Sequence, residues 1–132
     1  MRIRKPIERW FPAPEDPDKA EVKIRHLTPG ERQDISDQIL SQDISYEQDA
    51  EGKLKPIMKS RTDSKADREK KLIARLVDWK NMFDEDGQPM ECTPENIIKA
   101  SRKIEGFLDF VLERAKILED DIIAEAKIQE KN

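Results

Sequence analysis

The acidic turn at residues 84–87 has the residue types that a calcium site would use. Two aspartates two residues apart, followed by a glycine, occur in calcium-binding loops, but such a loop also needs an acid about five residues before the glycine and a glutamate about six residues after it. Met82 and Thr93 stand at those two positions. The turn therefore does not predict a calcium site.

Cys92, the only cysteine, is the other residue that could do chemistry. A cysteine nucleophile needs a base to activate it, and His26 is the only histidine available. We expect Cys92 to be a small residue in a short extended segment. The chain shows no zinc-ligand set, phosphate-binding glycine loop or nucleophile–base pair. The sequence thus predicts a protein that is not an enzyme, with no catalytic residue, metal or cofactor, and a function that lies in binding.

The elements around the acidic turn form a structural elbow at residues 77–96. Aromatic and methionine residues three to four apart predict one face of a helix that ends at the turn. Glycine can adopt the positive φ that the turn requires, and proline prevents re-entry into a helix. A threonine followed by proline then fits the start of the next helix. The residues predicted to build the elbow are Trp79, Phe83, Asp86, Gly87, Pro89, Thr93 and Asn96.

The N-terminal half predicts an antiparallel β-hairpin followed by a helix. Residues 7–12 and 20–27 read as short strands joined by a turn rich in proline and aspartate, and the prolines place the first strand at a sheet edge. Thr28 and Glu31 match a capping box, which predicts a helix over about 29–40. Residues 41–62 fit either a weak second hairpin or a mobile loop.

Two further helices are predicted, near 65–83 (capped by Ser64) and 94–118. The fold class is therefore α+β, mainly α, with three principal helices and a small antiparallel N-terminal sheet. We expect residues 1–118 to form a single domain and residues 119–132 a helical extension or frayed tail. The basic residues within 53–71 could contact an acidic partner or nucleic acid, but we favour a solvated helix start as their explanation, since no aromatic residue is interleaved for stacking.

The last predicted helix has apolar residues on more than one side. A seam with alternating steps of four and three residues runs from Ile97 through Val111 to Ile122, as in helix–helix packing. Other apolar residues fall outside this seam at about 100° per residue. A helix of this kind is either covered by its own domain or shared with a partner. The predicted partner-binding residues are Phe110, Ile117, Leu112 and Ile123.

Charge and hydropathy narrow the classes of partner and location. The net charge of −4 makes nucleic acid an improbable main partner, and no apolar run reaches the length of about 18 residues that a membrane span needs. One cysteine and a charged N-terminal stretch fit a reducing cytoplasm. We expect a cytoplasmic protein with no membrane contact.

The elbow resembles tail-assembly chaperones of long-tailed bacteriophages and prophages. The resemblance is carried by Trp79-x-x-Met-Phe-Asp-Glu-Asp-Gly-x-Pro followed by Thr-Pro-Glu-Asn96, and by Arg-His-Leu-Thr-x-x-Glu leading from the hairpin into the first helix. In layout it covers roughly residues 7–112, and only the elbow is specific.

This resemblance implies a mostly helical, self-associating protein in the bacterial host cytoplasm. Such a protein binds the tape-measure protein, and possibly the tail-tube protein, and keeps the tape-measure protein soluble while the tail tube polymerises. Some family members also have a longer form made by ribosomal frameshifting. The alternative function is a structural virion or adaptor subunit that stays in the finished particle.

Overall fold

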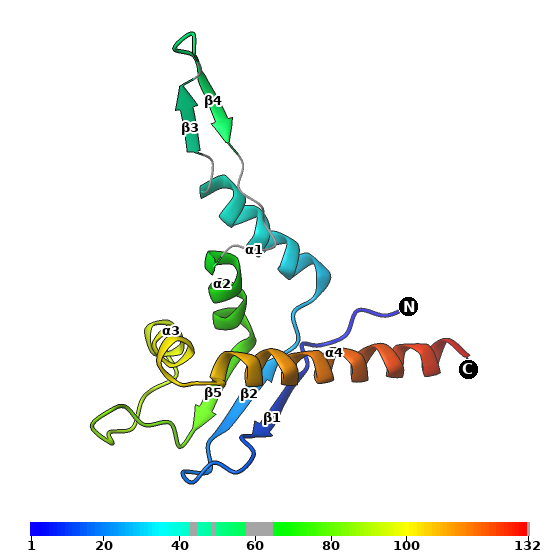
Figure 1. Cartoon of the computed structure of the whole chain (residues 1–132). Helices are drawn as coiled ribbons and strands as arrows, with labels where there is room; N and C mark the ends of the chain where they lie inside the picture. The colour runs from blue at the N-terminus through cyan, green and yellow to red at the C-terminus, as the bar shows by residue number, and fades with distance from the viewer. Residues whose placement is uncertain (43–44, 49, 58–64, 132) are drawn as a thin grey trace. The chain divides into compact units, whose positions relative to one another are not determined.

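A computed structural model describes residues 1–42, 45–48, 50–57 and 65–131 of the chain (Figure 1). The fold is α+β and mainly α, as the sequence predicts. The chain divides into two compact units, one made of residues 1–26 and 72–132 and the other of residues 27–71. We call them the sheet unit and the hairpin unit.

The sheet unit contains a three-stranded antiparallel sheet in the order β1-β2-β5. Its strands are β1 (Glu8–Pro12), β2 (Glu21–Arg25) and β5 (Leu76–Lys80). The predicted N-terminal hairpin is confirmed, and β1 lies at the sheet edge as its prolines require. In the connecting turn, the Ala20 amide donates to the Asp16 carboxylate at 2.8 Å.

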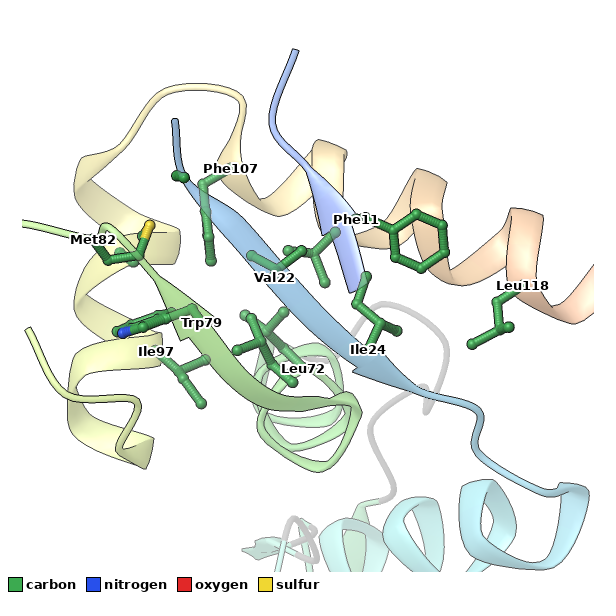
Figure 2. Packing of buried hydrophobic residues seen from close by; sticks show 13 residues of the cluster. Phe11, Val22, Ile24, Leu72, Trp79, Met82, Ile97, Phe107 and Leu118 are labelled. Carbon is green, nitrogen blue, oxygen red and sulfur yellow. The ribbon is translucent and has the colours of Figure 1, made fainter. Parts of the chain in front are cut away.

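The core of the sheet unit forms between one face of the sheet, Leu72, which precedes β5, and the helices that follow β5. Val22 and Ile24 of β2 are 1% and 0% exposed, since alternate residues of a strand point to the same face. Val111 and Leu118 of α4 (Phe107–Lys131) are both 0% exposed and belong to the same cluster, with Ile97 from α3 (Pro94–Lys103) (Figure 2). Packing of α4 against β2 thus confirms the part of the predicted seam that lies in α4.

The prediction of a helix over 65–83 is wrong beyond residue 75. Helix α2 spans Lys65–Arg75, and the next five residues form β5, which pairs with β2. Leu76 and Trp79 are both buried although they lie three residues apart, a spacing that fits a helical stripe and not a regular strand. The pairing with β2 shifts register between Lys23 and Ile24 and skips Val77, which brings both residues to the core face of the strand. The edge of β2 offers backbone N–H and C=O groups that pair with β5, and this pairing favours a strand over a helix.

The prediction of one helix over 94–118 is also wrong, because the chain turns between α3 and α4. Gly106 has a φ of 78°, a conformation open to glycine at little cost, and a Cβ built there would meet nothing within 4 Å. The glycine therefore serves the turn and does not admit a close neighbour. In contrast, the acidic residues 119–121 do not break the helix, since α4 continues to Lys131.

The hairpin unit begins with the predicted capping box. The Thr28 amide donates to Glu31 Oε1 and the Glu31 amide donates to Thr28 Oγ1, both at 3.3 Å, at the start of α1 (Pro29–Gln42). A second antiparallel hairpin follows, formed by β3 (Ser45–Gln48) and β4 (Leu54–Ile57), which resolves the sequence alternatives for 41–62 in favour of strands. The predicted cap at Ser64 lies outside the described residues.

Within the hairpin unit, one carboxylate is buried. Asp67 is 6% exposed, and it accepts hydrogen bonds from Ser36 Oγ at 3.1 Å and Lys71 Nζ at 2.8 Å. A buried carboxylate needs such donors to replace the water it loses. Asp67 therefore links α1 to α2 inside this unit.

Candidate partner-binding surface

The elbow begins at Trp79, a residue of β5 that packs in the core and hydrogen-bonds to the segment after the acidic turn. Its ring is 6% exposed and meets Phe107 edge to face, with ring centroids 6.3 Å apart. Its indole Nε1 donates to the Met90 carbonyl at 2.8 Å. Trp79 thus has the structural role predicted for it, but it acts from β5 and not from a helix.

The acidic turn is held by its own backbone and by one carboxylate. Asp84 Oδ1 accepts from the amides of Asp86 and Gln88, both at 2.9 Å. Gly87 adopts the predicted positive φ, at 76°, and its amide donates to the Asp84 carbonyl at 3.0 Å. These bonds occupy the carboxylate in building the turn, which is the structural use expected of aspartate here.

The two sides of the turn pair briefly as a miniature hairpin. Phe83 and Pro89 form an isolated antiparallel bridge, and the Met90 amide donates to the Met82 carbonyl at 2.8 Å. Met82 is buried, whereas Phe83 is 38% exposed. The elbow therefore places Phe83 outside the core, unlike the helical stripe that the sequence suggested.

Helix α3 opens as predicted. Thr93 is the N-cap, with its Oγ1 accepting from the Asn96 amide at 3.3 Å, and Pro94 is the first helical residue. The Asn96 side chain donates to the Glu91 carbonyl at 2.9 Å. Lys99 Nζ reaches back to Glu85 at 2.8 Å, and this exposed pair lowers the pKa of the Glu85 carboxyl. All seven predicted elbow residues thus lie in β5, in the start of α3 or in the segment that connects them.

Helix α4 carries the predicted partner-binding residues on both sides of its buried seam. Phe110 is half-buried against the core, and its ring lies under the Arg114 guanidinium at 5.4 Å. Ile117, about 20° away around the helix, is 37% exposed. Leu112 is half-buried and Ile123 is 46% exposed, and these two share the opposite flank of the seam.

The structure adds Ile128 to this surface. Ile128 is 62% exposed and lies on the same side of α4 as Ile117 at about 100° per residue. Ile128 is not among the predicted partner-binding residues, because the sequence leaves residues 119–132 as either a helical extension or a frayed tail. Its signal was the spacing of eleven residues from Ile117, which equals about three helical turns.

A groove of about 600 Å³ opens at the other end of α4, between the β1–β2 turn, the residues after β5 and the α3–α4 turn. We call it the acidic groove. Its apolar walls include Phe107 and Phe110 together with Phe83 and Ile104, and the last two are 38% and 40% exposed. Among the residues that line the groove, Arg114 is the one with a cationic side chain. The lining carboxylates are those of Glu15, Asp16, Asp18, Glu105, Asp109 and Glu113. The walls of the acidic groove come from three distant segments of the chain, so no local sequence pattern indicates it.

The surroundings of Cys92 favour its protonated, unreactive thiol form. Burial, followed by the nearby charge of Asp78, raises its pKa from 9.0 to about 11. Little thiolate therefore forms near pH 7, and thiolate is the nucleophilic form. Among the described residues, no three His, Cys, Asp or Glu side chains gather in a way that could hold a metal ion.

No helix in the described ranges is both long enough and apolar enough to span a membrane. Comparisons of the chain with family models, curated proteins and solved structures found no match.

Proposed function

We propose that this protein is a tail-assembly chaperone of a long-tailed phage or prophage that binds the tape-measure protein and keeps it soluble. It would act in the bacterial cytoplasm, without catalysis. The proposal rests on the elbow resemblance and on the character of α4. A long, helical, apolar client needs a partner that exposes apolar helix surface on an otherwise charged protein.

The main support for the proposal is that α4 extends beyond the core cluster of the sheet unit. Ile122 is the last residue of α4 that packs against the core cluster, yet the helix continues to Lys131. Figure 1 shows this end of α4 extending past the strands of the sheet unit. Ile123 and Ile128 stand there 46% and 62% exposed. The core cluster of the sheet unit thus ends at Ile122, and Ile123 and Ile128 lie on the helix beyond it.

The exposed isoleucines lie on two flanks of α4 rather than on one. Ile117 and Ile128 share one flank and Ile123 the other, while exposed Lys116 and Lys127 lie on the polar side between them. Full burial of one isoleucine contributes about 1.5–3 kcal/mol, so covering three part-exposed ones is enough to affect binding strongly. A helical client could pack along either flank in the manner of an amphipathic helix in a groove.

The test replaces Ile123 and Ile128 by serine and co-expresses the variant with the candidate tape-measure protein. Neither side chain belongs to the core cluster, so the variant should unfold at the temperature of the parent. The soluble fraction of the tape-measure protein should fall by about tenfold or more, as expected for lost apolar burial. Lys116→Ser with Lys127→Ser is the matched control and should solubilise the client like the parent. Undiminished solubilisation by the isoleucine variant would refute this surface as the binding site.

The alternative function, a structural virion or adaptor subunit, uses the same exposed helix end for a permanent contact. The two functions differ in whether the protein remains in the product. Mass spectrometry of purified particles should not detect a chaperone, whereas a structural subunit would be present in stoichiometric amount. Its presence would overturn the chaperone proposal.

A further inference from the structure

Apart from Val77 of β5, the exposed large apolar residues described in the sheet unit occur in three places. One is the end of α4, discussed above, and a second is the acidic groove, with Phe83 and Ile104. The third is residues 1–6, which we call the arm. The arm has no helix or strand, and its Met1 and Ile3 are 123% and 99% exposed.

We propose that the arm of one copy of this protein binds in the acidic groove of a second copy. The arm reads Met-Arg-Ile-Arg-Lys-Pro, so basic side chains alternate with apolar ones. The groove offers the complementary chemistry, with aromatic and aliphatic walls and six carboxylates against one guanidinium. Apolar burial would hold Ile3, and the charges would set the orientation and speed of encounter.

The dimensions suit this occupant. Six residues of extended chain span about 20 Å, and a volume of about 600 Å³ accommodates a few side chains of such a segment. Ile7, the next residue, is half-buried against the core, and its carbonyl accepts from the His26 amide at 2.9 Å. The arm is therefore attached to a fixed residue while its Met1 and Ile3 remain exposed.

The arm of the same chain is poorly placed to fill this groove. Arg4 lies 3.8 Å from Glu125, near the C-terminal end of α4, whereas the groove contains Glu105 and Glu113 from the other end of the helix region. Strand β1 separates the arm from the β1–β2 turn by five residues, or about 16 Å. Reaching its own groove would require the arm to reverse direction at Pro6 and to give up the contact with Glu125.

A contact of this kind joins different patches on the two copies. It either closes into a ring or a reciprocal pair, or continues as an open chain of copies. The charges at the groove are exposed to solvent, so the association should weaken as salt concentration rises. This inference concerns contacts between copies and does not depend on which client α4 binds.

The experiment is a charge exchange on the full chain, followed by sedimentation velocity. Glu105→Lys with Glu113→Lys reverses two of the six groove carboxylates, and Arg2→Glu with Lys5→Glu reverses two of the three basic side chains of the arm. Each pair alone should weaken self-association by about tenfold or more, because attractive contacts become like-charge contacts. All four changes together should restore association. Glu91→Lys with Asp120→Lys alters exposed carboxylates outside the groove and should leave association unchanged.

Circular dichroism and the unfolding temperature establish that each variant folds. If a reversal prevents folding, the Gln replacements at the same positions remove the charges without reversing them and should give a smaller loss of association. A parent that is monomeric at all concentrations would overturn the proposal. So would an association that survives both reversals, or a loss that the fourfold variant does not restore.

Discussion

Replacing Trp79 by alanine should destabilise the sheet unit more than any other single truncation in the elbow. The ring is 6% exposed, so its removal leaves a cavity between β5 and the helices. Large-to-small changes of a buried tryptophan cost about 3–5 kcal/mol. That figure includes an edge-to-face contact with Phe107, which contributes about 0.5–1.5 kcal/mol.

The hydrogen bond of Trp79 can be separated from its packing. Trp79→Phe keeps an aromatic ring but removes the donor to the Met90 carbonyl, which lies 2.8 Å from Nε1. Removing the donor to this part-buried carbonyl costs about 1 kcal/mol. We therefore expect Trp79→Phe to fall between the parent and Trp79→Ala.

Trp10 provides the matched control, since it is the other tryptophan and also lies in a strand of this sheet. It is half-buried, and its ring faces the Lys80 ammonium at 4.3 Å from the centroid instead of the core cluster. A cation–π contact of this exposure contributes about 0.5–1 kcal/mol. Trp10→Ala should therefore cost clearly less than Trp79→Ala.

The assay is equilibrium unfolding in urea, followed by circular dichroism at a helical wavelength. The transition midpoint should fall in the order parent, Trp10→Ala, Trp79→Ala, with slopes that remain similar. A midpoint for Trp79→Ala equal to that of the parent would refute the reasoning and make Trp79 an exposed contact residue. A larger loss for Trp10→Ala would show that the core lies on the other face of the sheet.

Two other predictions concern the elbow. Asp84→Ala removes the acceptor of the Asp86 and Gln88 backbone amides and should lower the free energy of unfolding by about 1–2 kcal/mol, measured by urea titration. Asp84→Asn keeps an oxygen acceptor and should recover most of this free energy. Equal losses for the two variants would contradict the role of Oδ1. Because the pKa of Cys92 is raised to about 11, alkylation of the folded protein by iodoacetamide should be slow at pH 7.5 and should rise towards pH 11. The raised pKa also means that the neutral thiol is favoured by folding, so its contribution to stability is full below pH 9 and decreases as the pH rises towards 11. Rapid alkylation at pH 7.5 would show that the thiol is not held in its neutral form.

Local sequence signals determined the parts of this protein whose partners are close in the chain. The capping box at Thr28, the N-cap at Thr93 and the positive φ at Gly87 each depend on bonds or conformations within a few residues. The N-terminal hairpin is equally local, since β1 and β2 are joined by a short turn. Trp79 is buried in β5, as a large aromatic beside other apolar residues would be in a helix or a strand alike.

Tertiary structure decided the remainder. The spacing of Leu76 and Trp79 fits a helix, but residues 76–80 form a strand because β2 offers an edge more than fifty residues earlier in the sequence, and a register shift at Val77 places both side chains in the core. The break at Gly106 depends on a turn that lets α4 cross β2, which one glycine in a helical pattern does not specify. The acidic groove exists only where three distant segments meet. Which apolar residues of α4 remain exposed is likewise set by how far the sheet extends beneath the helix, since periodicity gives the faces of a helix but not what covers them.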